Sequence, residues 1–418
     1  MGMKEALMKI VVKVHDVVAL AKRFEASPRQ AMQEVVTEVR AALQSALEQT
    51  MKAELALFLG QESELDNKRN GYRVREFGIK GVGVLQLRVP RDRAGRFQSK
   101  IVPAQRHYDE AIERDLALLH LAGISTRMLA YISKQVLGVR VSHEEVHRSL
   151  DTLLPGAKRF LERPLNGRTF VYLYLDGTNF HVRRTTVQKE PTLVVIGVDE
   201  KGHKSVLSMT QGDRDNRRAW EMVFADLKTR GLDASTIRLG IMDGLPGLAD
   251  AFAEAFRQAR VARCWIHKAR NVFPRVPRRY QAAFQASWDK MQYAADGAAA
   301  REAFNALTTQ WKDTCGNALD CIERDLDALL VHYEFPKEHR GALRTTNAIE
   351  RVHKEFKRRT KAMDSVGPET LNVLLAFTAM RLEFGWSRSP ITSASIANLQ
   401  NQRSREDHLD EITRTLLN

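Results

Sequence analysis

The stretch FVYLYLDGTNF, residues 170–180, carries a carboxylate, Asp176, directly after a run of residues suited to a buried strand. Taking an unpaired carboxylate out of water costs several kcal/mol even after relaxation, so this position calls for a partner. The arrangement recurs in IRLGIMDGLPGL, residues 237–248, where Asp243 also follows an apolar strand and precedes a glycine. Two aspartates in the same setting predict a shared cation at the ends of neighbouring strands.

The elements around these two stretches follow a definite order. Hydrophobic patterning predicts three strands, a helix, a strand, a helix and a strand, in the ranges 170–184, 191–200, 204–212, 216–232, 237–243, 245–259 and 261–267. The first three strands predict an antiparallel meander, and the later alternation of strand and helix predicts parallel crossovers. This is the order of an α/β RNase H-like catalytic domain, in which the strands ending at Asp176 and Asp243 lie side by side.

A third metal ligand is expected from the helix TTNAIERVHKEFKRRTKAM, residues 345–363, which follows an all-helical insertion. At 100° per residue, three lysines fall within about 40° of Glu350, and the apolar residues gather on the far side. The lysines are Lys354, Lys357 and Lys361, and the apolar residues are Ile349, Val352 and Phe356. Glu350 therefore belongs to a polar, basic face, and the alternative interpretation is a simple helical ion pair with Lys354.

Sequence patterns in the N-terminal part of the chain predict a mainly helical region that binds DNA. Residues 12–59 have apolar residues three and four apart, Asn70-Gly71 predicts a turn, and residues 72–90 alternate like a small β-element. Residues 123–154 have the pattern of a helix-turn-helix, with a break at Leu137-Gly138 and a capping box between Ser142 and Glu145. The second helix would then present His143, Glu144, His147 and Arg148 to DNA, whereas an ordinary αα-hairpin is the alternative.

These patterns predict seven divisions of the chain. They are an N-terminal helical region (1–66), a small β-rich element (67–106), a helix-turn-helix DNA-binding region (107–163), the first part of the RNase H-like core (164–267), the helical insertion (268–344), the closing helices of the core (345–386) and a polar C-terminal tail (387–418).

Composition limits the class of protein. A chain of 418 residues is too long for one ordinary core, so two or more domains are expected. Lys and Arg exceed Asp and Glu by 14, which favours nucleic acid as the partner. The three cysteines form no CxxC pair, so neither a disulfide framework nor a zinc ribbon is predicted. The sequence shows neither a secretion signal nor a long apolar run, and we expect a cytoplasmic protein that does not enter membranes.

In these motifs the chain resembles the Mutator-type bacterial insertion-sequence transposases of the DDE class. The resemblance extends over about residues 70–386 and rests on six segments: RNGYRVR (69–75), GISTR (123–127), YLYLDG (172–177), GIMDGLPGL (240–248), RCWIHKARNV (263–272) and TTNAIER (345–351). It implies that the acidic triad of the family falls on Asp176, Asp243 and Glu350. It also implies two Mg²⁺ ions, with Mn²⁺ able to substitute, and DNA hydrolysis at the transposon end followed by strand transfer into target DNA.

The segment RCWIH resembles the family's Cys/Asp-x-x-His signature. Two ligands make an incomplete zinc site, so His267 is expected to hydrogen-bond active-site or DNA groups, while Cys264 and Trp265 either support the site or simply pack. Arg263, Lys268 and Arg270 surround the motif and are expected to contact phosphates. A second basic surface is predicted on the closing helix, with a solvated helix face as the alternative; its members are Lys354, Lys357, Arg358, Arg359 and Lys361.

The leading hypothesis is a bacterial DDE transposase, nucleoid-associated when bound to DNA, that binds terminal inverted repeats as a homodimer or larger homo-oligomer. Two alternatives stay open, a DNA-binding regulator without turnover and an RNase H-like nuclease without strand transfer. The intact triad disfavours the first, and the family-like N-terminal region with the CxxH segment disfavours the second. Among other acids, Asp199, Asp213 and Asp215 are better explained by turn chemistry or helix capping.

Overall fold

A computed structural model describes residues 17–61, 67–212, 216–361, 363, 366–386 and 415 of the chain. The chain divides into two compact units, residues 1–149 and 150–418, and each is described by itself. The division falls inside the range 107–163 that was predicted as one region. Apart from Thr415, the predicted tail lies outside the described residues, as do Asp213 and Asp215. None of the described helices is long and apolar enough to cross a membrane.

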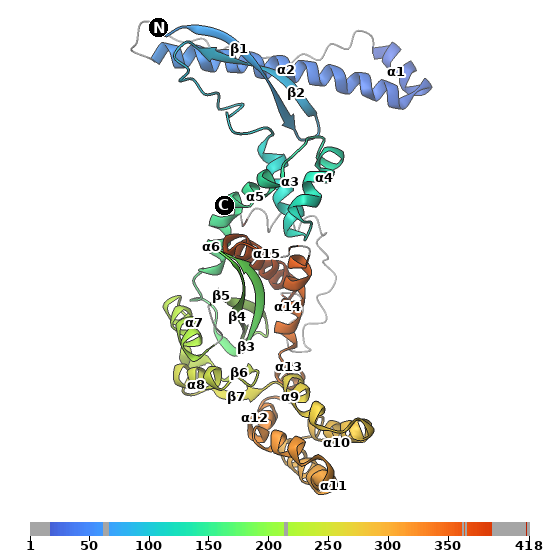
Figure 1. The fold of residues 1–418 in the computed structure, drawn as a ribbon, viewed down its shortest axis with the longest axis vertical. Helices are drawn as coiled ribbons and strands as arrows, with labels where there is room; N and C mark the ends of the chain where they lie inside the picture. The colour runs from blue at the N-terminus through green and yellow to red at the C-terminus, as the bar shows by residue number, and fades with distance from the viewer. Residues whose placement is uncertain are drawn as a thin grey trace. The chain divides into compact units, whose positions relative to one another are not determined.

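The first unit begins with two helices and a β-hairpin. The helices are α1 (Val17–Ala26) and α2 (Pro28–Gln61), and the hairpin consists of β1 (Arg69–Ile79) and β2 (Gly83–Asp92). Alternate side chains of the hairpin turn toward α2 and form a small core with it, composed of Met51, Phe77, Leu85, Leu87, Val89 and Val102. In Figure 1 the hairpin lies along α2. The predicted helical start and the small β-element are therefore both present.

The turn predicted at Asn70-Gly71 is wrong. Gly71 has a φ of 66° but lies within β1, where the register shifts between Arg69 and Tyr72. The chain reverses at residues 80–82, which include Gly81 and are followed by Gly83; their φ values are 78° and 94°. An Asn-Gly pair reports a backbone that takes positive φ, and a glycine bulge inside a strand satisfies that requirement as well as a hairpin turn does.

Three short helices complete the first unit: α3 (Glu110–Leu121), α4 (Thr126–Leu137) and α5 (His143–Ser149). The predicted helix ends are confirmed, because Ser125 caps α4 by accepting from Met128 N and Gly138 follows α4 with a φ of 73°. The capping box is also present: Ser142 N donates to Glu145 at 2.8 Å and Glu145 N donates to the Ser142 hydroxyl at 3.2 Å.

The second unit opens with α6 (Leu154–Leu161) and is built on a five-stranded sheet in the order β5-β4-β3-β6-β7. The strands are β3 (Phe170–Arg183), β4 (Val187–Asp199), β5 (Lys204–Gln211), β6 (Leu239–Met242) and β7 (Arg260–Arg263). β3, β4 and β5 pair antiparallel, whereas β6 pairs parallel with both β3 and β7. The predicted meander, the parallel crossovers and the side-by-side position of β3 and β6 are confirmed.

Helices cover both faces of this sheet (Figure 1). On one face, α7 (Arg217–Thr229) and α8 (Pro246–Ala255) pack through Trp220, Phe224 and Phe252 against alternate β3 residues such as Leu173 and Leu175. On the other lie α14 (Asn347–Thr360) and α15 (Pro368–Trp386). Because side chains alternate along a strand, Tyr172, Tyr174 and Asp176 point toward the α14 face.

The stretch predicted as an all-helical insertion contains α10 (Gln281–Gln292), α11 (Gly297–Glu323), α12 (Leu326–Leu330) and α13 (Lys337–Leu343). It is entered through α9 (Trp265–Val272), whose Trp265 belongs to a core with Phe284, Trp288 and Trp311. The strand predicted over residues 261–267 is therefore too long: β7 ends at Arg263, and Lys268 N already donates to the Cys264 carbonyl in a helical turn. A short apolar run does not distinguish strand from helix.

Gly240 in β6 allows Phe252 to pack directly on the strand. A Cβ at this position would lie 2.4–2.7 Å from three carbons of the Phe252 ring. Gly240→Ala should therefore lower the free energy of unfolding by about 1–3 kcal/mol, as overpacked core positions do. Urea denaturation measures this loss. Gly341→Ala in α13 is the matched control, since nothing lies within 4 Å of the added carbon; equal losses for the two variants would contradict the packing argument.

His332, between α12 and α13, is buried against the ring of Trp265, and its Nδ1 lies 2.8 Å from the Leu329 carbonyl. Burial lowers the pKa of His332 from 6.5 to about 4, so the folded state favours the neutral ring. Below pH 6.5 the unfolded chain binds the extra proton, and stability should fall by up to about 3 kcal/mol as the pH approaches 4. Denaturation across this pH range should show a shallower loss for His332→Phe. The exposed His181→Phe should keep the wild-type pH dependence, and parallel curves for all three proteins would contradict this account.

Candidate active site

Two of the three predicted carboxylates lie together at the centre of the sheet. In the parallel pairing of β3 with β6, Leu175 is opposite Met242, so Asp176 and Asp243 are the next residues on the two strands. Asp176 continues in β3 and is buried, at 6% exposure, on the face toward α14. Asp243 is the first residue after β6 and is partly exposed. The prediction that these strands bring the two aspartates together is confirmed.

The main chain around both aspartates is fixed by short contacts. One oxygen of Asp176 accepts from Gly177 N at 2.9 Å, and one oxygen of Asp243 accepts from Leu245 N at 3.1 Å. The Arg263 guanidinium, from the end of β7, donates to the Asp243 carbonyl at 2.5 Å and to the Gly244 carbonyl at 3.3 Å. Arg263, which was predicted to contact phosphates, therefore positions the main chain at Asp243, the residue after β6.

Glu350 lies in the first turn of α14 and faces α9. Its Oε1 is 2.8 Å from Arg270 Nη2 and 3.9 Å from His267 Nε2. The contact with Arg270 is an ion pair without hydrogen-bond geometry, and the buried Oε1 has no hydrogen bond to any residue that the structure describes. Arg270 was predicted to contact phosphates, and here it neutralises a predicted metal ligand.

No group of three or more His, Cys, Asp and Glu side chains among the described residues lies close enough to hold a metal ion. The structure thus brings Asp176 and Asp243 together, while Glu350 is paired with α9. Carboxylates are the donors that Mg²⁺ and Mn²⁺ prefer, so the chemistry of the three side chains fits such ions. Glu350 also shares a side of α14 with His353, one turn later, which contacts Asp176.

His353 is the residue of this site that sequence reasoning missed. Its Nδ1 lies 3.6 Å from the second oxygen of Asp176, and the ring is 8% exposed. Burial, with smaller contributions from Lys357 and His267, lowers the pKa of His353 to about 3. The spacing of three residues puts His353 on the same side of the helix as Glu350, but it does not reveal the contact with Asp176.

The CxxH segment joins the start of α9 to the start of α14. The buried Cys264 sulfur accepts from Thr346 N at 3.3 Å and from its hydroxyl at 3.2 Å, and His267 Nδ1 lies 3.4 Å from that hydroxyl. The hydrogen bond with Cys264, together with the charges of Cys264, Asp176 and Asp243, raises the pKa of His267 to about 8 against the effect of burial. His267 thus contacts the active-site helix, as one interpretation of the motif expected.

Trp265 and Lys268 are structural residues of the insertion. Trp265 is buried and donates from its indole nitrogen to the Leu329 carbonyl at 2.9 Å. Lys268 is 6% exposed, and its ammonium forms an ion pair with the Asp325 carboxylate. The same carboxylate oxygen lies 3.2 Å from Arg263 Nη2. The expected phosphate contact of Lys268 is therefore contradicted, because the ammonium is buried and paired with Asp325. Cys264 is buried and its sulfur bonds to Thr346 at the start of α14, so it packs and also supports that helix.

The predicted basic face of α14 contains four exposed cations, and their role in binding DNA stays a prediction: Lys354, Lys357, Arg358 and Lys361. Placing Arg359 on this face was wrong. Arg359 is 1% exposed and bonds to the Glu355 carbonyl and carboxylate at 3.0 and 2.7 Å, with its guanidinium 5.7 Å from the Phe377 ring centre. Nine residues at 100° each place it opposite Glu350, on the side of the apolar seam.

The residues predicted on the second helix of the helix-turn-helix are exposed: His143, Glu144, His147 and Arg148. Their neighbours Val146 and Ser149 are buried, so α5 presents one polar side away from its core. Whether these side chains contact DNA stays a prediction.

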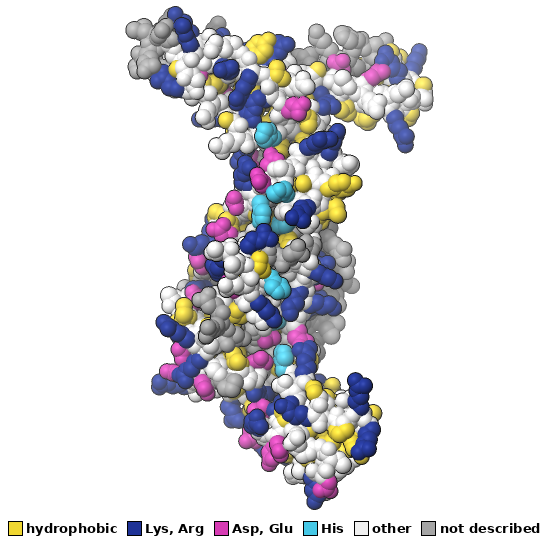
Figure 2. Space-filling view, in the orientation of Figure 1, with side chains coloured by type: hydrophobic (Ala, Val, Ile, Leu, Met, Phe, Trp, Pro, Cys, Tyr) yellow, Lys and Arg dark blue, Asp and Glu magenta, His cyan; other side chains and the backbone are white. Residues whose placement is uncertain are grey.

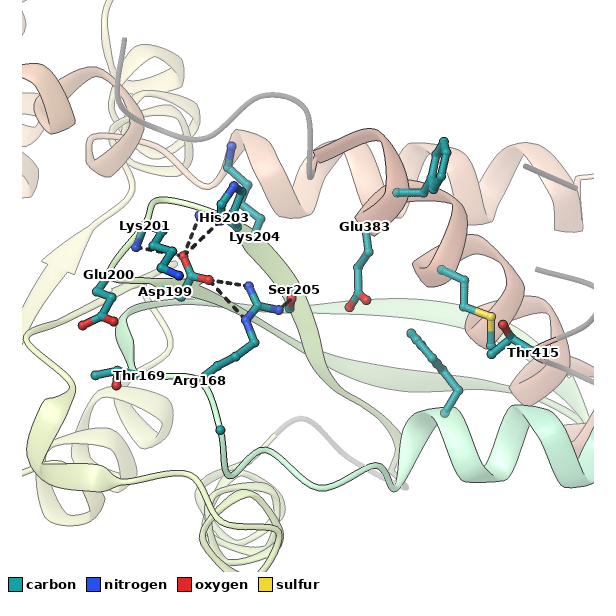
Figure 3. Close-up of a pocket in the computed structure, with 14 residues that line it drawn as sticks. Arg168, Thr169, Asp199, Glu200, Lys201, His203, Lys204, Ser205, Glu383 and Thr415 are labelled. Carbon is teal, nitrogen blue, oxygen red and sulfur yellow. Dashed lines mark hydrogen bonds and ion pairs between the residues drawn. The ribbon is translucent and has the colours of Figure 1, made fainter. Parts of the chain in front are cut away.

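Asp199 forms the turn that was predicted for it. Its carboxylate accepts from Lys201 N at 3.0 Å, from His203 N at 2.8 Å and from the Arg168 guanidinium at 2.6 Å, as the dashed lines in Figure 3 mark. This residue is the last of β4, and its bonds explain its burial without a metal ion.

Known proteins match this chain over most of its length. Residues 12–387 match the family described as "Transposase, Mutator family". The chain is 28% identical over 349 residues to the transposase for insertion sequence element IS1201 of Lactobacillus helveticus, covering 82% of this chain and 94% of the relative. It is 30% identical over 328 residues to that for IS905 of Lactococcus lactis (77% and 83%) and 29% identical over 352 residues to that for ISRM5 of Rhizobium meliloti (82% and 87%).

The relatives define the class as transposases of insertion sequences. This chain belongs to the Mutator family of transposases, as its motifs indicated.

Asp325 is the acid on which two cations behind the active site depend. Asp325→Ala would leave Lys268 buried without its counter-ion and should lower the free energy of unfolding by about 2–4 kcal/mol. Denaturation of Lys268→Met and of the double variant Lys268→Met/Asp325→Ala completes the cycle. The double variant should be more stable than Asp325→Ala alone, because it removes the orphaned ammonium. Additive losses would mean that the pair does not hold Lys268 in place.

Proposed function

We propose that this protein is an RNase H-like DDE transposase that cuts DNA at the ends of an insertion sequence and joins those ends to target DNA by two-metal-ion phosphoryl transfer. The observation that carries the proposal is the parallel pairing of β3 with β6, which places Asp176 beside Asp243. The names of the relatives supply the substrate class, since each is the transposase for an insertion sequence element.

Asp176, Asp243 and Glu350 would hold Mg²⁺, or Mn²⁺ in its place, because these hard ions prefer carboxylate and water oxygens. When bound, such ions activate an attacking water or 3′-hydroxyl and stabilise the leaving oxygen of an in-line displacement. The chain contributes a fixed main chain at Asp243 through Arg263, and it holds Glu350 beside Arg270 until the site is loaded.

DNA is the proposed partner of both units. In the first unit, α4 and α5 would act as a helix-turn-helix that reads the terminal inverted repeats with His143, His147 and Arg148. In the second, the exposed cations of α14 begin one turn after Glu350 and would contact backbone phosphates near the acids. Figure 2 shows further Lys and Arg side chains spread over the visible face, interspersed with acids, so the charge excess is not confined to one element.

We further propose that the protein works as a homodimer or larger homo-oligomer, because an insertion sequence has two ends that must be joined to one target. Each copy would carry its own set of carboxylates. Size-exclusion chromatography with light scattering, with and without end DNA, measures this assembly.

The proposed chemistry depends on Asp243. Asp243→Asn keeps the shape of the side chain and removes its charge, so Mg²⁺-dependent cleavage of duplexes carrying the flanking repeats should fall at least about 10³-fold, while binding to those duplexes persists. Asp250→Asn, an exposed acid of α8, is the matched control and should cleave like the wild type. A gel-based cleavage assay with and without Mg²⁺ gives both numbers.

Undiminished cleavage by Asp243→Asn would place the active site elsewhere. Specific binding by the wild type without cleavage in Mg²⁺ or Mn²⁺ would favour the regulator hypothesis. Cleavage without joining to a target duplex would favour the nuclease.

A further inference from the structure

Charge is segregated between the helical insertion and the segment that enters it. Residues 263–280 carry six Lys and Arg side chains and no Asp or Glu, whereas residues 281–334 carry four cations and nine acids. All of these residues lie in the described part of the chain. In Figure 2, Lys and Arg side chains gather on the α10 side of the insertion. A face that only keeps a protein soluble mixes both signs of charge, so a segment without acids favours an anionic partner.

Three of the six cations already have acidic partners. Arg263 and Lys268 share the Asp325 carboxylate, and Arg270 is paired with Glu350. The other three are exposed arginines of the turns that follow α9, and we call them the arginine strip: Arg275, Arg278 and Arg279. None of them belonged to the basic surfaces predicted from the sequence.

The main chain that carries the arginine strip is held in place. It forms two short helical turns, η3 (Phe273–Arg275) and η4 (Arg278–Tyr280), and each has a proline in it or directly before it. The Gln281 side-chain amide donates to the Phe273 and Val276 carbonyls at 3.4 and 3.2 Å. The Phe273 ring also packs edge-on against two aromatic rings of the insertion core. The arginines therefore stand on a rigid base, which lowers the entropy cost of binding a ligand.

Two side chains of the strip are also oriented by their neighbours. The Arg279 guanidinium lies 4.7 Å from the centre of the Tyr280 ring, and that ring packs edge-on against Trp311 of α11. The Arg275 guanidinium donates to the carbonyl of Asn271, in the last turn of α9. A guanidinium has five N–H groups in a planar fork, so both side chains keep donors whose geometry matches phosphate oxygens.

The arginine strip lies close to the candidate active site. Arg270, whose guanidinium is 2.8 Å from the Glu350 carboxylate, is nine residues before Arg279. Nine residues span at most about 32 Å when fully extended, and the helical turns of this segment shorten that distance. One turn of B-DNA is about 34 Å long, so the strip lies within one turn of a duplex held at Glu350.

We propose that the arginine strip binds backbone phosphates of the double-stranded DNA on which the active site acts. Duplex DNA carries one negative charge per about 1.7 Å of its axis, so three arginines on a short segment meet several phosphates. Phosphate contacts position a duplex without reading its sequence, so the insertion would hold the DNA that α4 and α5 select. The inference rests on the proposed function for the presence of DNA at the active site, and it assigns a binding role to the insertion.

The salt dependence of DNA binding tests the strip. The triple variant Arg275→Gln/Arg278→Gln/Arg279→Gln, made on Asp243→Asn to prevent turnover, is titrated with duplexes carrying the flanking repeats at about 50 to 200 mM salt. Loss of two or three phosphate contacts should make the slope of log K against log salt shallower by about 1.8–2.7 than in Asp243→Asn alone. The matched control on the same background, Arg301→Gln/Lys312→Gln/Arg324→Gln, removes three exposed cations from α11 and the residue after it, and it should leave the slope unchanged.

Further variants separate the remaining outcomes. Replacing the same three arginines by lysine should restore most of the slope, because the slope counts charges, and melting temperatures check that every variant is folded. Equal slopes for the triple glutamine variant and its control would overturn the proposal. Loss of self-association by the triple variant in light scattering, with an unchanged DNA slope, would mean that the strip binds acids of a second copy, and this result would also overturn it.

Failure of the strip and failure of the proposed function give different results. If Asp243→Asn still cleaves while the triple variant shows the shallower slope, the strip stands and the assigned chemistry falls. If Asp243→Asn has lost cleavage while the triple variant keeps the steeper slope, the chemistry stands and the strip falls. A wild type that does not bind the duplex overturns both.

Discussion

The parallel pairing of β3 with β6 is the constraint on which the site depends. It runs only from Tyr172–Leu239 to Leu175–Met242, yet it sets two aspartates, distant in sequence, at the same level of one sheet. A slip of one residue would move Asp176 to the face covered by α7 and α8, inside an apolar core. Gly240 makes such a slip unfavourable, because the Phe252 ring occupies the space that a side chain at this position of β6 would need. The packing of the sheet therefore also fixes the placement of the acids.

The strand order and both aspartates could be predicted because their signals are local. An apolar run that leads into Asp-Gly reports its own burial, and the sequence of strands and helices then limits the topology. It does not report the strand end in both cases, because β6 ends before Asp243 whereas β3 continues past Asp176 to Arg183. His353 could not be assigned in the same way, since its role comes from a contact with Asp176 that only the packing of α14 on β3 creates. The error at Arg359 has another origin, because charge alone was taken as a sign of exposure although the helical angle placed it on the apolar seam.

The CxxH segment shows why a motif can be recognised while its structure is misjudged. Its residues were read as the end of a strand, but they form the first turn of α9, and this turn lets Cys264 and His267 reach Thr346. Asn70-Gly71 is the same kind of case, since the positive φ was read correctly and the bulge was not. In both places the backbone conformation follows from residues that lie elsewhere in the chain.

The position of α9 has a mechanical consequence. This helix belongs to the core of the insertion through Trp265, and the same helix carries the two basic side chains that face Glu350. Arg270 and Trp265 lie little more than one helical turn apart, so a shift of the insertion that carries α9 along is transmitted to the carboxylate as a change in local charge. The charge beside Glu350 is thereby tied to a hydrophobic core that lies outside the sheet.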